Sequence, residues 1–289
     1  MKPAPFTYAA PSTVEEAIAL LAEHGDTAKL LAGGQSLMPL MNLRLARPQY
    51  IIDLNRIAGL DSIQEHDGAL VVGTMTRQRS LERVPTVRQY YPLLSEATTL
   101  IGHVAIRNRG TVGGSIAHAD PAAELPAVLL AHGGSVRVQG PRGTRQIVAD
   151  SLFRTYLTTA LEPDEILTEV HFPRWSLGTG WCFLEESRRH GDFAMVGVAV
   201  LLTLDAARQC TQVAVALCGV GDIPHKVAAA PTLLLGHPLD EARLRAVAQA
   251  AASEIEPDSD LHASAEFRRH LSAVLTQRAL RKAAERAAP

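Results

Sequence analysis

Two stretches of the chain combine paired glycines with small hydroxyl side chains, at residues 30–37 and 110–124. In each stretch a Gly-Gly pair is followed by a serine, directly or one position later. Glycine accepts positive φ and lets a ligand approach the bare backbone, and consecutive N–H groups in such a turn form an anion-binding nest. Two of these turns could hold one pyrophosphate from both sides, although a single Gly-Gly pair is more often an ordinary turn.

The first stretch does not match the common phosphate-binding motifs. Gln35 and Ser36 stand where a P-loop has Lys followed by Ser or Thr, and the glycine spacing also differs. The Gly-x-Gly-x-x-Gly pattern of a Rossmann dinucleotide site is absent as well. The sequence therefore predicts a nucleotide-type ligand that is held in another arrangement.

An acidic residue, Glu124, ends the second stretch. A carboxylate just beyond a phosphate nest can accept hydrogen bonds from ribose hydroxyls, as acidic residues do at other dinucleotide sites. The alternative is a first-turn acid that the helix dipole stabilises. The two interpretations are compatible.

Other arrangements that could do chemistry are weak. His118 and Asp120 lie two positions apart, but two ligands do not make a metal site. The triplet at residues 190–192, His-Gly-Asp, is typical of an exposed loop. Ser36 and Ser115 have no evident base partner, and neither lies in a Gly-x-Ser-x-Gly motif. If the protein is an enzyme, a bound cofactor therefore carries the chemistry.

Composition limits the classes of function. The 289 residues allow two domains, and 47% hydrophobic residues suit a protein with a substantial core. A net charge of −2 gives no reason to expect nucleic acid or a charged membrane surface as partner. The longest apolar run, residues 193–204, is too short to span a bilayer and is expected to be a buried strand.

The three cysteines form no Cys-x-x-Cys pair. This argues against a zinc or iron–sulfur site on this chain and gives no disulfide framework. The N-terminus has no apolar signal core. We therefore expect a reduced, cytoplasmic setting.

The elements that position the glycine stretches follow from hydrophobic periodicity. Ser12 and Thr13 both fit a capping box for a helix that Gly25 ends. The arginines Arg107 and Arg109, which precede the second stretch, are expected on a solvated strand edge. Strands are predicted at residues 29–32, 50–54, 69–72, 135–139, 146–148 and 165–172; helices at 80–83, 92–98 and 122–131; and a polar turn at 61–68.

The composition changes near residues 174–180, where we place a domain boundary. Beyond it, Val-rich strands at 193–204 and 212–220 precede amphipathic helices at 240–253 and 263–287. Strands followed by helices predict a small α+β domain.

Taken together, the two stretches resemble the FAD-binding medium subunit of molybdenum hydroxylases. They read Ala-Gly-Gly-Gln-Ser-Leu from Ala32 and Gly-Thr-Val-Gly-Gly-Ser-Ile-Ala-His-Ala-Asp-Pro-Ala-Ala-Glu from Gly110. The likeness extends over essentially the whole chain and includes residues 164–167 and 187–194. This family contains aerobic carbon monoxide dehydrogenase, bacterial xanthine dehydrogenase and related aldehyde or N-heterocycle dehydrogenases.

The resemblance implies an α+β fold in two domains. Residues 1–175 would form an FAD-binding domain of the vanillyl-alcohol-oxidase (PCMH) type, with subdomains at about 1–57 and 58–175. Residues 176–289 would form a C-terminal domain of the carbon monoxide dehydrogenase flavoprotein type. That domain would hold a three-stranded sheet and helices.

The resemblance also assigns roles to residues. Residues 30–37 and 111–115 would surround the FAD pyrophosphate, and Glu124 would meet the adenosine-side ribose. Ile101 and Leu167 would pack on the cofactor, and Phe193 would lie near the isoalloxazine. The full set is Leu30, Leu31, Ala32, Gly33, Gly34, Gln35, Ser36, Leu37, Ile101, Thr111, Val112, Gly113, Gly114, Ser115, Asp120, Glu124, Leu167 and Phe193.

One position departs from the family pattern. Some relatives have a Lys near the flavin pyrimidine end, where Leu184 aligns in this chain. Arg188 or a backbone group would then serve instead. No residue of this chain is expected to act as a catalytic acid or base or to bind a metal.

In this family the chain works with a large molybdenum subunit and a small subunit with two [2Fe–2S] clusters. The resemblance implies a dimer of such heterotrimers, with the molybdopterin cofactor and the clusters on the partner chains. Electrons would pass from the clusters to FAD and on to NAD, a quinone or another small-molecule acceptor. The complex would be cytoplasmic, with membrane association only through the complex. The alternatives are a stand-alone FAD-dependent oxidoreductase and a non-catalytic nucleotide-binding protein.

Overall fold

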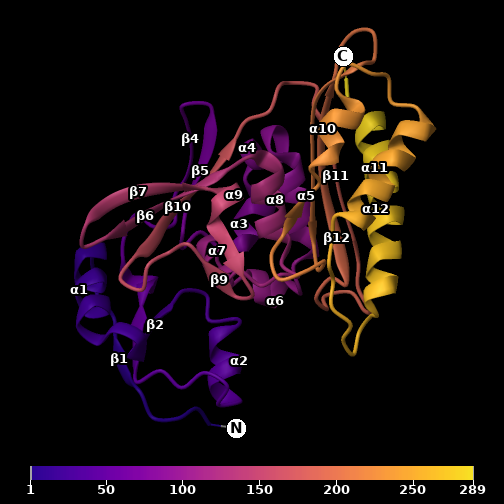
Figure 1. The fold of residues 1–289 in the computed structure, drawn as a ribbon. Coiled ribbons are helices and arrows are strands. Elements are labelled where there is room, and N and C mark those ends of the chain that lie inside the picture. Colours follow the sequence, from indigo (N-terminus) through magenta and orange to yellow (C-terminus); the bar gives the residue numbers. More distant parts are fainter. Residues whose placement is uncertain (1, 289) are drawn as a thin grey trace.

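The computed structural model describes residues 2–288, in three larger sheets and one two-stranded ladder, with helices around and between them (Figure 1). The N-terminal part is a parallel sheet in the order β1-β3-β2. Its strands are β1 (Thr7–Ala9), β2 (Ala28–Leu31) and β3 (Tyr50–Asp53), and its helical segments are α1 (Val14–His24), η1 (Gly25–Thr27), α2 (Leu37–Asn42) and η2 (Leu54–Arg56).

The start of α1 distinguishes between the two predicted caps. Thr13 is the N-cap, because its hydroxyl accepts a hydrogen bond from the Glu16 N–H at 3.1 Å. The Glu16 carboxylate accepts in return from the Ser12 N–H at 2.8 Å. Gly25 ends the helix with a φ of 49°, as predicted. The first of these hydrogen bonds satisfies a donor that the helix start leaves free, and the second ties the residue before the cap to the first turn.

The middle of the chain forms an antiparallel sheet in the order β4-β5-β10-β6-β7. Its strands are β4 (Ile63–His66), β5 (Ala69–Gly73), β6 (Ser135–Gly140), β7 (Gly143–Val148) and β10 (Ile166–Pro173). A small ladder pairs β8 (Phe153–Thr155) with β9 (Thr158–Thr159). The helices are α3 (Gln78–Arg83), α4 (Pro85–Tyr90), α5 (Pro92–Leu100), α6 (Val104–Arg107), α7 (Val112–His118), α8 (Glu124–His132) and α9 (Ala149–Leu152).

The structure corrects two predictions in this part and adds one helix that was not predicted. The polar turn predicted at residues 61–68 contains β4, an edge strand whose side chains are mostly exposed. Helix α4 follows directly on α3 and was not predicted. Helix α8 begins at Glu124 rather than at residue 122, because Asp120 first forms a turn in which its Oδ1 accepts from the Ala122 N–H at 2.9 Å.

The C-terminal part is an antiparallel sheet in the order β11-β12-β13-β14. The predicted three-stranded sheet is therefore extended by a short fourth strand. The strands are β11 (Gly180–Glu186), β12 (Val196–Leu204), β13 (Cys210–Cys218) and β14 (His225–Lys226), and the helices are α10 (Ala229–Leu234), α11 (Glu241–Ser253) and α12 (Ala265–Arg286).

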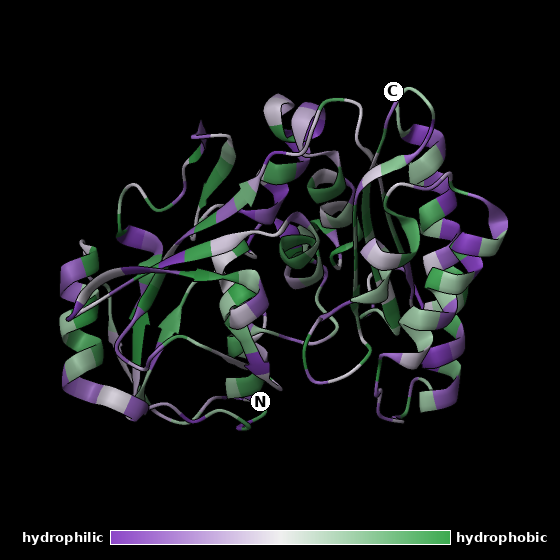
Figure 2. Ribbon diagram, turned by 45° about the horizontal axis from the view of Figure 1, so that its top comes forward, coloured by the Kyte–Doolittle hydropathy of each residue, from purple (hydrophilic) through white to green (hydrophobic). Residues whose placement is uncertain are grey.

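This sheet is covered on both faces. Helices α11 and α12 lie on its outer face, and α5 and α8 lie on the other (Figure 1). Strand β12 is therefore a nearly continuous apolar run (Figure 2), as expected for a strand that is buried on both sides. Every residue of α8 is buried. The predicted boundary at residue 175 stays a prediction, since one apolar core continues from the middle sheet through α8 into this sheet.

Helix α5 is fastened to the C-terminal sheet by one carboxylate. Glu96 accepts hydrogen bonds from the Trp181 indole N–H at 3.2 Å and from the Phe183 N–H at 3.2 Å. It also accepts from the Arg286 guanidinium at 2.7 Å, which brings in the end of α12. One side chain thus joins three elements.

We predict that Glu96→Ala lowers the free energy of unfolding by about 1–3 kcal/mol, because three donors lose their acceptor. Chemical denaturation of the purified chain measures this change. Glu23→Ala, which removes an exposed glutamate of α1, is the matched control and should change stability by less than about 0.5 kcal/mol. Equal effects of the two substitutions would show that Glu96 does not fasten the sheet.

Candidate cofactor-binding site

The two glycine stretches lie against each other. We call residues 32–37 the first motif and residues 110–115 the second motif. A Cβ at Gly33 would collide with the carbonyl oxygen of Arg109 and would lie 2.7 Å from the Gly110 Cα. A Cβ at Gly114 would lie 3.4 Å from that of Ala32. The structure therefore brings together the two segments that the sequence singled out.

The first motif presents a run of free backbone donors. Within residues 2–288, the N–H groups from Gly33 to Leu37 donate to no protein acceptor. Gly34 has a φ of 72°, so the chain turns in the left-handed region at this point. The side chains of this segment, apart from Gln35, are half-buried. Consecutive N–H groups in a turn of this kind suit a phosphate.

The second motif is built differently from the prediction. Gly113 and Gly114 lie in the first turn of α7, and neither has positive φ. The N–H of Val112 donates to the Thr76 carbonyl, and that of Gly113 to the Thr74 carbonyl, both at 2.9 Å. The N–H of Gly114 donates to the Thr111 hydroxyl at 3.0 Å. The prediction of a second backbone nest is therefore wrong, because these donors already have protein acceptors.

Glycine is required in the second motif for close packing instead. A Cβ at Gly113 would collide with the Thr74 hydroxyl and lie 2.6 Å from the Thr74 Cβ. What this motif offers a ligand is its hydroxyl groups. Ser115 Oγ, which is half-buried, has no hydrogen-bond partner among residues 2–288. The Thr111 hydroxyl accepts from Gly114 and keeps its own proton free to donate.

Two residues that the sequence analysis missed connect the motifs. The Asn55 side-chain amide donates to the carbonyl oxygen of Ala32 at 2.9 Å. The Arg77 guanidinium donates to Asn55 Oδ1 and to the carbonyl oxygen of Arg109, both at 2.6 Å. Asn55 follows β3, which runs parallel to β2, and the carboxyl ends of parallel strands meet at one edge of a sheet. That topological signal could have indicated Asn55 from the sequence.

The carboxylate of Asp53 holds Asn55 in place through two hydrogen bonds. Asp53 Oδ1 accepts from the Asn55 backbone N–H at 2.9 Å and from its side-chain amide at 2.5 Å. The Tyr8 hydroxyl donates to Asp53 Oδ2 at 2.6 Å. Burial alone would raise the pKa of Asp53, but the hydrogen bonds from Tyr8 and Asn55 outweigh it and lower the pKa. Asp53 is therefore an ionised acceptor at neutral pH.

Three of the apolar residues assigned to the cofactor, Ile101, Leu167 and Phe193, lie in different surroundings. Ile101 and Leu167 are buried in the core of the middle part. Phe193, in the loop between β11 and β12, is 69% exposed. That loop lies against His103, since a Cβ at Gly191 would be 2.7 Å from His103 Nδ1. The exposed Phe193 therefore belongs to a loop that meets the segment directly after Ile101.

Leu184, which stands where some relatives have a Lys, faces away from the glycine motifs. Leu184 packs with the apolar cluster between the C-terminal sheet and its outer helices. Its neighbour Glu185 lies on the opposite face of β11, as alternation along a strand requires. One oxygen of Glu185 is buried and has no hydrogen-bond partner among residues 2–288.

Glu124 is buried at the start of α8, with only 7% of its surface exposed. Burial, followed by the charge of Glu185, raises the pKa of Glu124 to about 8. Burial likewise raises the pKa of Glu185 to about 7. Asp120, which was also assigned to the cofactor, accepts a hydrogen bond through Oδ1 in the turn before α8. The structure thus places two carboxyl groups, one on α8 and one on β11, that form no ion pair among residues 2–288.

The arginines before the second motif do not lie on a strand edge. Residues 104–107 form α6, and Arg107 is buried at 5% exposure. Its guanidinium donates to Glu82 Oε1 at 2.6 Å and to the Ile101 carbonyl at 2.8 Å. The prediction of a solvated position is correct only for Arg109, which is exposed. Arg107 instead holds the segment that carries Ile101.

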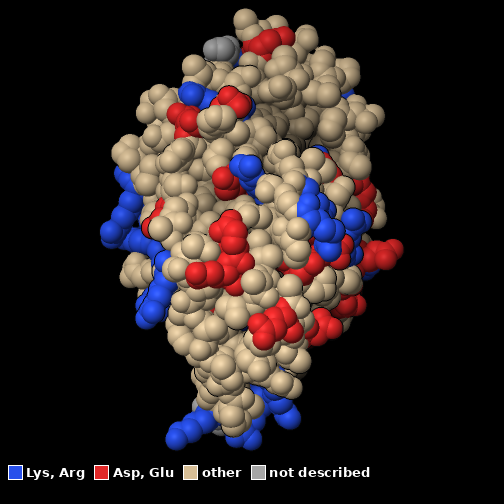
Figure 3. Space-filling model, turned by 90° about the vertical axis from the view of Figure 1, so that its left-hand side faces the viewer, with Lys and Arg blue, Asp and Glu red and all other residues tan. Residues whose placement is uncertain are grey.

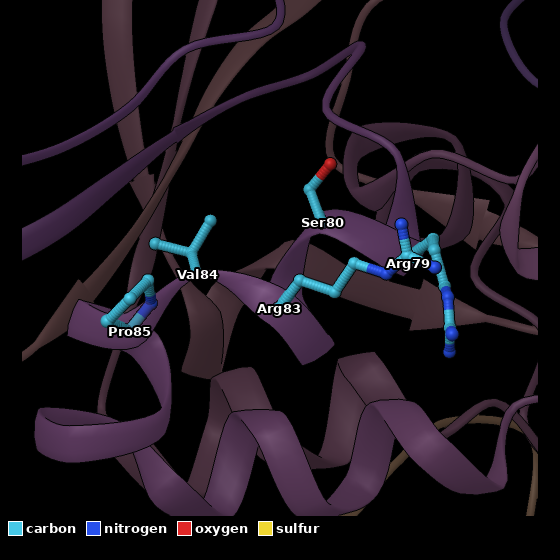
Figure 4. A pocket seen from close by; sticks show the side chains of 5 residues that line it. All are labelled: Arg79, Ser80, Arg83, Val84 and Pro85. Carbon is cyan, nitrogen blue, oxygen red and sulfur yellow. The ribbon is translucent and has the colours of Figure 1, made fainter.

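The other surface features of the described residues lie apart from the two motifs. Acidic and basic side chains are interspersed over the face in Figure 3. A shallow depression on α3 and α4 is lined by Arg79, Ser80, Arg83, Val84 and Pro85 (Figure 4) and contains no residue of either motif. In the described part of the chain, no three His, Cys, Asp or Glu side chains are placed to hold a metal ion. No helix among the described residues is long and apolar enough to cross a membrane.

Comparisons with known proteins cover the whole chain. Residues 4–175 match a family described as the FAD binding domain in molybdopterin dehydrogenase. Residues 181–283 match one described as the CO dehydrogenase flavoprotein C-terminal domain. The subunit alpha of the 6-hydroxypseudooxynicotine dehydrogenase complex from Paenarthrobacter nicotinovorans is 41% identical, covering 100% of this chain and 98% of the relative.

A second relative and a solved structure indicate the same family. The subunit beta of caffeine dehydrogenase from Pseudomonas sp. (strain CBB1) is 39% identical, covering 99% of this chain and 97% of the relative. Among solved structures, the carbon monoxide dehydrogenase from Hydrogenophaga pseudoflava that lacks the Mo-pyranopterin moiety contains a chain with a TM-score of 0.98 and 39% identity, over 100% of both chains.

The fold and the site define an FAD-binding protein with a separate C-terminal sheet-and-helix layer, and the free N–H groups of the first motif fit the pyrophosphate of that cofactor. The chain belongs to the family of FAD-binding medium subunits of molybdenum hydroxylases. It is accordingly a subunit of an oxidoreductase. The resemblance that the glycine motifs indicated is thereby confirmed.

Proposed function

We propose that this chain is the electron-transfer subunit of a molybdenum hydroxylase complex and holds FAD at the contact between its two glycine motifs. The observation that carries the proposal is the run of free backbone N–H groups from Gly33 to Leu37, which lies directly against the second motif. A pyrophosphate is the part of FAD that such donors recognise. The hydroxyls of Thr111 and Ser115 would complete its hydrogen bonds.

The remaining assigned residues serve the other parts of the cofactor in this proposal. Leu30, Leu31 and Ala32 lead into the first motif, and Asp120 and Glu124 lie at the adenosine side. Phe193 would cover the isoalloxazine, because its loop meets the segment that follows Ile101. Ile101 and Leu167, which are already buried, would contribute only an edge to the cofactor.

The chain's own task is to bind and orient the cofactor and to exclude water from it. When bound, FAD supplies the electron-transfer chemistry, accepting electrons from [2Fe–2S] clusters of a partner subunit and delivering them to NAD, a quinone or another acceptor. Both relatives are named as dehydrogenase subunits, and one of them as a subunit of a dehydrogenase complex. By analogy, we propose a large molybdenum subunit and a small iron–sulfur subunit as partners, in a dimer of heterotrimers in the cytoplasm.

The test is the absorbance spectrum of the chain, purified both alone and with co-expressed partner subunits, followed by identification of the released ligand. We expect flavin bands and release of FAD on denaturation. Reduction of the flavin by the substrate of the complex, only when all three subunits are present, would support the electron path. A protein that is colourless and does not take up added FAD would contradict the proposal, and turnover of an organic substrate by this chain alone would favour a stand-alone oxidoreductase.

A further inference from the structure

We propose that Asn55 and Arg77 are positioning residues that connect the two glycine motifs and aim the first motif at the pyrophosphate. This inference rests on the proposed function. The connection runs from the Ala32 carbonyl through the Asn55 amide and the Arg77 guanidinium to the Arg109 carbonyl, with successive donor–acceptor distances of 2.9, 2.6 and 2.6 Å. We call this chain of hydrogen bonds the bridge.

The bridge acts through the geometry of the peptide unit. A trans peptide is planar, and its C=O and N–H groups point in opposite directions. Because the Ala32 carbonyl points to Asn55, the N–H of Gly33 in the same peptide unit points to the opposite side. That N–H has no protein acceptor among residues 2–288. Asn55 thereby directs the first donor of the nest to the side opposite its own, where no protein acceptor among residues 2–288 takes it up.

The other end of the bridge fixes the distance between the motifs. Arg77 holds the carbonyl oxygen of Arg109, which is the same atom that a Cβ at Gly33 would strike. The backbone on both sides of Arg77 is itself paired with the second motif. The Gln78 N–H donates to the Gly110 carbonyl, and the Val112 N–H donates to the Thr76 carbonyl, both at 2.9 Å. Arg77 is therefore rooted beside one motif and connected through Asn55 to the other.

The support below Asn55 limits its freedom. Asp53 accepts from both the backbone and the side chain of Asn55. The side-chain amide has two N–H groups, and because one of them donates to Asp53, the other is left to donate to the Ala32 carbonyl. The side chain is thus oriented before a ligand arrives, and such preorganisation favours binding.

The test is equilibrium titration of the full chain, freed of its flavin, with FAD. Asn55→Leu removes the donor to the Ala32 carbonyl and the acceptor for Arg77 without adding a charge, and Arg77→Met removes both guanidinium hydrogen bonds. Each substitution should raise the Kd for FAD about tenfold or more. Because both substitutions break the same bridge, the Kd of the double variant should increase by clearly less than the product of the two single increases.

Two neighbouring arginines provide matched controls. Arg56→Met and Arg109→Met each remove an exposed positive charge near the site, and the second leaves the Arg109 carbonyl in place. Both should change the Kd by less than about threefold. A large effect of Arg77→Met with no effect of Asn55→Leu would overturn the bridge and indicate that Arg77 contacts the anion directly.

A second readout distinguishes positioning from a general loss of structure. ADP shares the pyrophosphate with FAD, whereas riboflavin lacks it. The bridge variants should lose affinity for ADP in proportion to FAD, keep their affinity for riboflavin and keep the melting temperature of the flavin-free chain. Equal losses for ADP and riboflavin would overturn the inference. If the unaltered chain binds no FAD, both the proposed function and the bridge are wrong. If the unaltered chain and both variants bind FAD equally well, only the bridge is wrong.

Discussion

Replacing Gly33 by alanine is expected to abolish the retention of FAD during gel filtration and to lower the free energy of unfolding by about 1–3 kcal/mol, the usual effect of overpacking. The new Cβ would collide with the Arg109 carbonyl oxygen and would lie 2.7 Å from the Gly110 Cα. Both are backbone atoms, so no flexible side chain can move aside. The two motifs would have to separate, and the free N–H groups would lose their position.

Gly221→Ala is the matched control. Gly221 does not have positive φ, and a Cβ there would have only the Glu256 carbonyl oxygen nearby, at 3.7 Å, an ordinary contact. The melting temperature and FAD content of the Gly221→Ala variant should remain close to those of the unaltered chain.

The melting temperature and the FAD content of Gly33→Ala also distinguish two causes of a loss of FAD. A methyl group that only blocked the ligand would leave the melting temperature of the flavin-free chain unchanged, whereas separation of the motifs lowers it. Unchanged FAD binding by Gly33→Ala would contradict the contact between the motifs.

The sequence predicted the position of the two glycine motifs but only part of their structure. The glycine motifs were recognised from residue types and spacing, and the structure puts them side by side. The physical reason for the glycines was only partly predicted. Positive φ applies to Gly34, while Gly33 and Gly113 are needed because neighbouring atoms leave no room for a Cβ. Steric contacts between segments distant in the chain are not encoded in local spacing.

The same limit explains the residues that were missed. Asn55 and Arg77 acquire their role from hydrogen bonds to carbonyl groups of the two motifs, and a backbone carbonyl has no signature in the sequence. Arg107 was expected in solvent because most arginines are exposed, yet Glu82 and the Ile101 carbonyl satisfy it inside the protein. By contrast, local signals such as the cap at Thr13 and the stop at Gly25 were predicted correctly.

The buried pair Glu124 and Glu185 predicts that the stability of the flavin-free chain falls as the pH rises from about 4.5 to about 8. An unperturbed glutamate has a pKa near 4.5, whereas the pKa is about 8 for Glu124 and about 7 for Glu185 in the folded chain. Between these values the folded chain keeps protons that the unfolded chain releases. The unfolded state therefore gains stability relative to the folded state as the pH increases through this window.

Glu124→Gln should remove much of this dependence, because the amide has nearly the same shape and never ionises. We expect the variant to match the unaltered chain near pH 5 and to be more stable by about 1–3 kcal/mol near pH 8.5. Denaturant titrations across this pH range measure the difference. Glu23→Gln, an exposed change in α1, should leave the pH profile unaltered. Parallel profiles for Glu124→Gln and the unaltered chain would show that Glu124 ionises freely in the fold.

The partner carboxyl gives a further test of the same pair. The charge of Glu185 is the second cause of the raised pKa of Glu124, after burial. Glu185→Gln should therefore lower the pKa of Glu124 and shift the upper end of the stability loss toward lower pH, while the loss itself persists. FAD titrations at pH 6 and pH 8.5 extend the test to the site. If Glu124 accepts ribose hydroxyls as an ionised group, FAD affinity should rise with pH in the unaltered chain and not in Glu124→Gln, whereas a pH-independent difference between the two would assign Glu124 to the packing of α8 alone.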